Sequence, residues 1–409
     1  MGGSSADALV VFSSVLTIAI LLVTYGGLAL GKWPGLGLNR PTIALVGAAA
    51  LVGVGAMSIP QAWQAMDART MVFLLSMMVV NGALSQVGIF ARVLQGLVRH
   101  SRHPLGLLLW VTGGTGVLSA FLLNDTLALV ATPLVIQVTQ ALRLNPVPYL
   151  LALAAATNIG SVATISGNPQ NILVGSFSGI SYGEFARVMT PVAVAGLGIL
   201  VGLIWWFYPE VRSRKRFSLP PLPDLTPPTP EFWGHVLVTV GLFGAFVAGV
   251  PLAEAALVTA AIFLCWRRDH PEGLLAWVDW GLLVLFAGLF ILTQTTRNLG
   301  IWQSLASLGT HTWVFMGLVT LLSNLISNVP TVLLLHPLIA PDDTQGWLLL
   351  AAASTLAGNL TLFGAVANLI TVEAAGRAGY PVSFWTHFQL GLPLTLLTLI
   401  VAYLGIYWR

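Results

Sequence analysis

Apolar runs of roughly 18 residues or more recur along the whole sequence, and each is long enough to cross a hydrocarbon layer of about 30 Å. Only 8% of the 409 residues are charged, which is too few to cover the surface of a soluble protein of this length. The sequence therefore predicts an all-α polytopic membrane protein. Its first run, residues 7–30, lacks a positively charged start and a cleavage motif, so we expect a retained span.

The remaining composition excludes several function classes. The net charge of +3 comes from arginines at the ends of apolar segments, which is typical of membrane topology and implies no nucleic-acid partner. Cys265 is the single cysteine, so one chain can form neither a disulfide nor a multi-thiolate metal site. We find no Gly-rich phosphate loop, no metalloprotease motif and no nucleophile elbow. We therefore expect no cofactor, no ATP hydrolysis, and no enzyme.

A proline-rich stretch divides the sequence into two related halves. Residues 209–232 contain PPLPDLTPPTP and are predicted to form a linker between a first repeat, residues 1–208, and a second repeat, residues 233–409. Three blocks recur in the same order in both halves, with separations of 212, 204 and 197 residues. Matched residues in these blocks are Asp67 with Asp279, Asn124 with Asn328, and Asn171 with Asn368. This order favours a duplication over chance similarity of apolar helices.

The first half contains five predicted spans and one predicted hairpin. The spans lie near residues 8–31, 42–59, 70–98, 147–178 and 187–208, and the hairpin arms are residues 105–122 and 127–142. If the hairpin turns back near the midplane, each half crosses the membrane five times and the second half is inverted. If both arms cross fully, the positive loops are divided less cleanly between the two sides.

The basic residues predict an orientation for the hairpin model. Thirteen fall on one side, namely Lys32, Arg40, Arg92, Arg99, Arg102, Arg143, Arg212, Arg214, Lys215, Arg216, Arg267, Arg268 and Arg377. Four fall on the other side, namely Arg69, Arg187, Arg297 and Arg409. By the positive-inside rule, both termini lie outside and the linker lies in the cytoplasm of a bacterial-type inner membrane.

Polar residues interrupt the apolar sequence at four matched points. They are the hairpin tips at 124–126 and 327–331 and the mid-span interruptions at 166–171 and 363–368. Helix breaks at this depth are tolerated only where the freed backbone lines a cavity or is packed in protein, so we expect the four points to converge. Helix N-termini beginning at Thr126 and Thr331 would then offer N–H groups to an anion or polar solute.

Asp125 is the acidic residue that the sequence places deepest in the membrane. A carboxylate there is costly unless it is paired, ion-bound or protonated, so Asp125 is a candidate coupling residue. The alternative is that it caps the following helix. Asp67 and Asp279 open matched spans and are interpreted as helix caps. Neither tip and neither interruption contains Lys or Arg, so either helix dipoles and a co-bound or exchanged cation balance the charge of the substrate, or the substrate is weakly charged.

The motifs NDTLALVATPLV and SNVPTVLLLHPLI resemble the hairpin tips of the ion transporter superfamily. ATNIGSVATISGNPQNILV and AGNLTLFGAVANLI resemble its two interrupted helices. The superfamily includes arsenite/antimonite permeases, divalent-anion/sodium symporters and some sodium/proton antiporters. The resemblance implies a scaffold domain and a moving transport domain, an elevator-type mechanism, a homodimer in the lipid bilayer, and, in efflux systems, an ATPase subunit as partner.

The tips are more similar to those of arsenite permeases, whereas the interruption at 166–171 is more similar to that of the anion symporters. We expect arsenite or antimonite efflux driven by H⁺ or Na⁺, with a symporter of dicarboxylate, sulfate or a related small anion as the alternative. The resemblance implies a substrate site formed by Asn124, Thr126, Asn168, Asn171, Ser327, Asn328, Thr331, Gly364 and Asn368. It implies ion coupling by Asp125, Asn124, Ser166, Gly167 and Thr361, with Na⁺ as the metal ion that the tips would hold.

Two other classes compete with transport. An intramembrane enzyme would need a catalytic pair facing water, and the histidines and acidic residues form no such pair in the sequence. A nonconducting membrane subunit would have its polar tips packed together with no cavity. Transport instead predicts a solvated pocket bounded by the tips and the interruptions.

Overall fold

The computed structural model describes residues 3–33, 35–213, 216–217, 227–266, 272–300 and 311–408. Within these ranges the chain is helical apart from its turns, and the one β-type pairing is an isolated bridge between Lys32 and Asn39. Six helices in the described part are long and apolar enough to cross a membrane. The prediction of an all-α polytopic membrane protein is confirmed.

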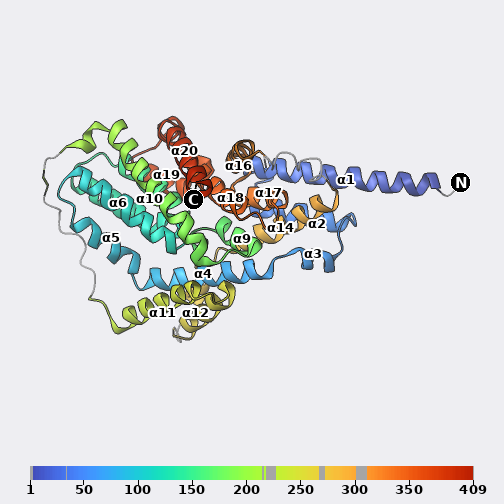
Figure 1. The fold of residues 1–409 in the computed structure, drawn as a ribbon, viewed down its shortest axis with the longest axis horizontal. Coiled ribbons are helices and arrows are strands. Elements are labelled where there is room, and N and C mark those ends of the chain that lie inside the picture. Colours follow the sequence, from blue (N-terminus) through green and yellow to red (C-terminus); the bar gives the residue numbers. More distant parts are fainter. Residues whose placement is uncertain are drawn as a thin grey trace.

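The first half contains ten α-helices (Figure 1). They are α1 (Gly3–Leu30), α2 (Arg40–Gly53), α3 (Ile59–Ala65), α4 (Ala68–Gln86), α5 (Ile89–Arg99), α6 (Pro104–Phe121), α7 (Asn124–Ala141), α8 (Val147–Ser161), α9 (Pro169–Ser178) and α10 (Tyr182–Phe207), with the 3₁₀ turn η1 (Ile165–Gly167) between α8 and α9. The expected single span at 70–98 is wrong. Gly88 has φ +76°, which ends α4 and lets α5 turn away from it.

The second half repeats this order after the 3₁₀ turn η2 (Pro209–Arg212). Its described α-helices are α11 (Pro230–Val247), α12 (Leu252–Trp266), α13 (Glu272–Leu275), α14 (Trp280–Asn298), α16 (Thr312–Ile326), α17 (Asn328–Leu335), α18 (Thr344–Leu356), α19 (Val366–Arg377) and α20 (Phe384–Tyr407). The 3₁₀ turn η3 (His336–Leu338) follows α17, and η4 (Ala357–Asn359) and η5 (Leu362–Gly364) separate α18 from α19.

The two halves pack reciprocally. Helix α2 of the first half packs on α14 of the second, and α12 of the second half packs on α4 of the first. In the same way α7 packs on α19, α17 packs on α9, and α10 packs on α20. Such exchanged pairs are what two copies related by a twofold axis would make. The inversion of one copy across the membrane stays a prediction.

The bounds of the repeats and of the linker also stay predictions. Helix α10 ends at Phe207 and α11 begins at Pro230, but residues 214–215 and 218–226 lie outside the described part of the chain. The charge count behind the predicted orientation includes further residues outside it, namely Arg214, Lys215, Arg267, Arg268 and Arg409.

In Figure 1, α1 reaches well beyond the other helices, while the C-terminal end lies near the middle of the molecule.

The first hairpin, α6 followed by α7, is fixed to the body by a close crossing with α8. Gly116 and Gly160 lie where the two helix backbones meet, with no room for a side chain at Gly160. The hydroxyl of Ser119 donates to the carbonyl of Thr157 beside this contact, and that of Thr164 donates to the carbonyl of Ala120. Small residues and hydroxyl groups are typical of helix crossings in membranes. This crossing sets the position of the hairpin tip.

Candidate functional site

The two hairpin tips present helix N-termini that no side chain caps. Helix α7 begins at Asn124 and α17 begins at Asn328, and neither preceding residue makes a side-chain capping hydrogen bond. At the second tip, Ser327 has φ +84° and ψ 160°, a backbone conformation that costs a non-glycine residue about 1–3 kcal/mol. Both helices begin a few residues earlier than Thr126 and Thr331, where the sequence analysis placed the starts. The N–H groups at both tips are free of side-chain caps.

The two mid-span interruptions are held by the same amide contacts. Asn171 Nδ2 donates to the carbonyls of Ser161 and Thr164, at 2.9 Å in both cases. Asn368 Nδ2 donates to the carbonyls of Gly358 and Thr361, at 2.7 and 3.1 Å. In each half the asparagine therefore reaches back ten and seven residues. Each asparagine replaces the helical hydrogen bonds that its interruption gives up.

Alanine at either of these asparagines should lower the free energy of unfolding by about 2–4 kcal/mol, because two buried carbonyls lose their donor. Thermal unfolding of purified Asn171→Ala and Asn368→Ala in detergent measures this effect. The matched control is Asn298→Ala, at an exposed position on α14. If Asn171→Ala or Asn368→Ala unfolds at the wild-type temperature, the proposed role of these contacts is contradicted.

A chain of buried asparagines joins the first tip to the second interruption. Asn124 Nδ2 donates to Asn158 Oδ1 at 3.2 Å, and Asn158 Nδ2 donates to Asn359 Oδ1 at 3.0 Å and to Asn368 Oδ1 at 3.1 Å. Asn158 and Asn359 were not among the residues predicted from the sequence. In the sequence, each of the two is an amide side chain within an apolar run beside an interruption, and this pattern could have identified them. These hydrogen-bonded asparagines link the first half of the protein to the second half.

The two hairpin tips and the two interruptions all line one cavity of about 200 Å³. Its wall is formed by the first tip (Asn124, Asp125), the second tip (Ser327, Asn328, Val329), the first interruption (Pro169, Gln170), the second interruption (Ala365, Val366), and Arg40, Pro41, Asp279, Leu282 and Leu285 from α2 and α14. The structure thus brings together points that are up to 242 residues apart, from Asn124 to Val366. The expected convergence of tips and interruptions is present.

Four of the predicted site residues lie in this wall, namely Asn124, Asp125, Ser327 and Asn328. The other predicted residues surround the wall and do not line it, namely Thr126, Ser166, Gly167, Asn168, Asn171, Thr331, Thr361, Gly364 and Asn368. The hydrogen bonds that the structure shows for these residues join them to other residues of the protein. Thr331 Oγ1 donates to the Ser327 carbonyl at 2.9 Å, and Ser166 Oγ lies 3.0 Å from the Tyr182 hydroxyl.

Further contacts explain why several of these residues lie behind the wall. Thr361 Oγ1 donates to Asn324 Oδ1 at 2.8 Å, which anchors η5 to α16. Asn168 caps α9 by accepting from the Asn171 N–H at 2.8 Å. In the orientation that satisfies its neighbours, Asn328 Nδ2 donates to the carbonyls of Gly364 and Ser354, at 3.2 and 3.0 Å. Asn328 therefore both lines the cavity and ties the second tip to the second interruption.

The cavity contains a cationic side chain that the sequence analysis missed. Arg40 begins α2, is half-buried, and donates through Nε to the carbonyl of Leu28 at 3.2 Å. Its position before an apolar run was interpreted only as a topology charge, and the tips and interruptions themselves contain no Lys or Arg. Arg40 therefore adds a cationic residue to the helix dipoles and the co-bound or exchanged cation that were expected to balance a charged substrate.

Two carboxylates accompany Arg40 in the wall. Asp279 Oδ1 caps α14 by accepting from the Leu282 N–H at 2.9 Å, as predicted, and its exposed side chain also lines the cavity mouth. The carboxylate of Asp125 lies near the backbone N–H of Ala367, at the start of α19. Asp125 on the first tip thus contacts the interruption of the other half.

Helix N-termini supply further positive potential. Helices α7, α17 and α19 start at the cavity without a side-chain cap, and α9 starts there behind Asn168. Each start brings unpaired N–H groups and a partial positive charge. The Oδ1 atom of Asn124 is buried without a hydrogen-bond partner among the described residues, which makes it an available ligand for a cation or a hydroxyl group. The wall therefore offers both donors and acceptors.

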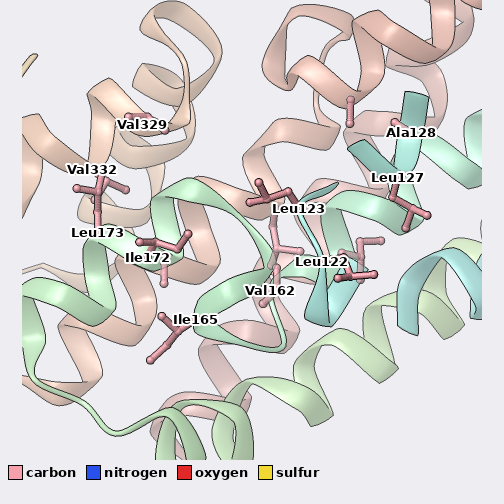
Figure 2. Packing of buried hydrophobic residues seen from close by; sticks show 14 of the residues in the cluster. Leu122, Leu123, Leu127, Ala128, Val162, Ile165, Ile172, Leu173, Val329 and Val332 are labelled. Carbon is pink, nitrogen blue, oxygen red and sulfur yellow. The ribbon is translucent and has the colours of Figure 1, made fainter. Parts of the chain in front are cut away.

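A second cavity of about 170 Å³ lies at the opposite ends of α9, α14 and α17. It is lined by Gln64, Ala65, Met66, Asp67, Phe177, Phe290, Thr293, Gln294, Arg297, Leu333 and His336. Between the two cavities each of these helices carries a fully buried apolar residue, namely Leu173, Leu289 and Val332. Figure 2 shows Leu173 and Val332 together where α9 packs on α17. The first cavity is thus closed at one end by an apolar layer.

Comparison with known proteins agrees with this architecture. The citrate transporter family model, CitMHS, matches residues 15–357. The silicon efflux transporter LSI3 of Oryza sativa subsp. japonica is 31% identical, over 89% of this chain and 91% of that protein. A Dictyostelium discoideum protein that carries the transporter name arsB is 22% identical, over 89% of this chain and 86% of that protein.

One solved structure shows the same fold. The YdaH transporter of Alcanivorax borkumensis superposes with a TM-score of 0.59 at 16% identity, and the match covers 97% of this chain and 98% of that one. The resemblance to the ion transporter superfamily, including its arsenite-permease branch, is confirmed by the family match and the relatives. The chain is a multi-pass membrane protein that belongs to the citrate transporter family of the ion transporter superfamily.

Proposed function

We propose that the protein is a secondary active transporter that exports a small, neutral, hydroxylated solute, most simply arsenite or antimonite, in exchange for H⁺ or Na⁺. The observation that carries the proposal is the cavity of about 200 Å³ at which two hairpin tips and two helix interruptions meet. Transporters of this repeat architecture place substrate and coupling ion where interrupted helices converge. A small volume with mixed donors and acceptors suits a compact solute that has several hydroxyl groups.

The charges in the cavity favour a neutral solute over a dianion. The cavity wall contains one guanidinium, Arg40, and two carboxylates, Asp125 and Asp279. The negative charge of a bound dianion would therefore be only partly balanced. Hydroxyl groups can donate to the carboxylates and accept from helix N–H groups at once. Arsenite near pH 7 is largely the uncharged trihydroxide. Cys265, the single cysteine, is not in the cavity wall, so thiolates play no part in recognition. The name of the rice relative, a silicon efflux transporter, also supports export of a small solute.

The coupling ion is assigned to the first tip. Asp125 is the carboxylate on the tip itself, and the adjacent Asn124 has an unpartnered side-chain oxygen. A carboxylate with a neighbouring amide oxygen can hold a proton or form part of a Na⁺ site. The other predicted ion residues, Ser166, Gly167 and Thr361, would hold the interruptions in the shape that this site needs.

The movement is assigned to the hairpins and interruptions sliding past α2 and α14. Arg40 and Asp279 belong to these two helices, so the cavity lies on the boundary between them and the hairpin elements. Its mouth is at the N-terminal ends of α2 and α14, a side predicted to be cytoplasmic. Elevator-type transport would carry the tips toward the side of the second cavity. The homodimer and the ATPase partner stay predictions.

Uptake into everted membrane vesicles tests substrate and coupling together. Arsenite, silicic acid, succinate and sulfate would each be supplied under an imposed proton gradient, an imposed sodium gradient, or neither. We expect gradient-dependent accumulation of arsenite and little accumulation of the two anions. Accumulation of succinate or sulfate without arsenite would overturn the assignment of a neutral solute.

The guanidinium of Arg40 favours a second candidate, a symporter of a dicarboxylate, sulfate or a related anion. The variant Arg40→Gln separates the two candidates. A neutral solute loses a hydrogen bond from the guanidinium, so its KM should rise about fivefold, whereas an anion loses a hydrogen-bonded ion pair and its KM should rise about 10- to 100-fold. Lys32→Gln is the matched control, because Lys32 is exposed near the same helix start and does not line the cavity.

A further inference from the structure

An apolar groove of about 840 Å³ lies on the first hairpin, apart from the transport cavity. Its wall comes from α5, the α5–α6 turn, α6 and the residue Arg216 after η2, namely Val93, His100, Arg102, His103, Gly106, Leu109, Trp110, Gly113, Gly114, Val117, Leu118 and Arg216. The residues on α6 recur every three or four positions, so they share one face of that helix. The groove therefore runs lengthwise along α6.

The groove has one basic end and one apolar end. His100, Arg102, His103 and Arg216 gather where α6 begins, and no Asp or Glu is among the residues that line the groove. The backbone N–H of Phe217 donates to the carbonyl of Arg102 at 3.0 Å, which holds Arg216 beside the basic residues of the α5–α6 turn. From Gly106 onward the lining is apolar or glycine as far as Leu118. An occupant must therefore be anionic at one end and apolar along its length.

The groove is long enough to cross one membrane leaflet. The 14 residues from Pro104 to Val117 span about 21 Å at the helical rise of 1.5 Å per residue, against about 15 Å for half of a bilayer core. Leu109, Trp110 and Val117 have exposed fractions of 49%, 39% and 60%, so this face of α6 is not covered by the rest of the described chain. Arg102 and Arg216 belong to the predicted cytoplasmic side, where the leaflet carries anionic lipids.

We propose that this groove binds an anionic phospholipid, with the headgroup phosphate at Arg102 and Arg216 and an acyl chain along α6. Three glycines, Gly106, Gly113 and Gly114, line the groove, and a Cβ atom built at Gly113 meets no atom within 4 Å. The same face with a leucine at this position would have no room for the chain. The site is formed between α5 and α6, the hairpin arm that precedes the tip at Asn124, so an occupied groove would brace that arm from the lipid side.

Native mass spectrometry of the purified full-length protein tests the site without any transport assay. The probes are dioleoyl phosphatidylglycerol and dioleoyl phosphatidylcholine, titrated separately. We expect phosphatidylglycerol to bind at least about tenfold more tightly, since each basic residue at the surface contributes on the order of 1 kcal/mol toward an anionic lipid. Equal affinities for the two lipids would overturn the proposal.

Two variants locate the binding. Arg102→Gln/Arg216→Gln should abolish the preference for phosphatidylglycerol, and Gly113→Leu should remove the tight binding of this lipid by filling the groove. The charge-matched control is Arg143→Gln/Arg377→Gln, at exposed positions outside the groove. Wild-type preference in both groove variants, with unfolding temperatures unchanged, would place the lipid elsewhere and overturn the assignment.

Discussion

Asparagine in place of Asp125 should reduce gradient-driven accumulation to an inside-to-outside ratio of about 1, because a residue that no longer binds the coupling ion contributes no coupling free energy. The substitution preserves the size of the side chain and keeps an acceptor oxygen near the Ala367 N–H. Folding should therefore be retained. Uptake of arsenite into vesicles under proton and sodium gradients measures the effect, and solute exchange without a gradient should persist.

The matched control for this prediction is Asp342→Asn, which removes the same charge at an exposed residue before α18. It should transport as the wild type does. If Asp125→Asn also accumulates solute as the wild type does, the coupling role is wrong, and the carboxylate serves only to cap or hold the start of α19. If Asp125→Asn loses both gradient-driven accumulation and exchange without a gradient, Asp125 is assigned to solute binding instead.

Alanine at Gly160 should destabilise the protein by at least about 3 kcal/mol, the upper range for an overpacked core, because backbone atoms bound this site. A Cβ atom at Gly160 would overlap the carbonyl oxygen of Gly116 and lie 2.6 Å from its Cα. Relief requires α6 to move away from α8. That movement would break the hydrogen bond from Ser119 to Thr157 and displace the first hairpin tip.

Thermal unfolding in detergent, together with solute binding, measures this second effect. Gly198→Ala is the matched control, since Gly198 lies within α10 and its built Cβ atom meets nothing within 4 Å. We expect the control to unfold at or slightly above the wild-type temperature, because alanine favours the helix. A Gly160→Ala protein with wild-type unfolding and binding would show that the close crossing does not position the hairpin.

The architecture could be predicted because apolar length and repeated blocks record it directly. The matched asparagines Asn171 and Asn368 were visible as a separation of 197 residues, and they make equivalent contacts in the structure. The end of α4 was harder to place. Gly88 lies in an apolar run, and a positive φ at glycine leaves no trace in hydropathy.

The site was predicted only in part, because the sequence shows which residues are polar and not which way they face. Asn124 and Asn328 line the cavity, whereas Asn168 and Asn171 use their amides to hold an interruption. Arg40 was missed because it lies 84 residues before the first tip and reaches the cavity only through the packing of α2 on α14. Long-range packing of this kind has no signal in one sequence.

The most direct test of the central claim is to fill the cavity and measure gradient-driven arsenite uptake. Val366 lines the cavity at the start of α19, so Val366→Trp would occupy the space between the tips. Phe363→Trp is the control, on the same interruption at a residue that is 58% exposed and does not line the cavity. Uptake lost in a stably folded Val366→Trp protein and retained in Phe363→Trp is the predicted result. Wild-type uptake by Val366→Trp would contradict the claim that solute passes through this cavity.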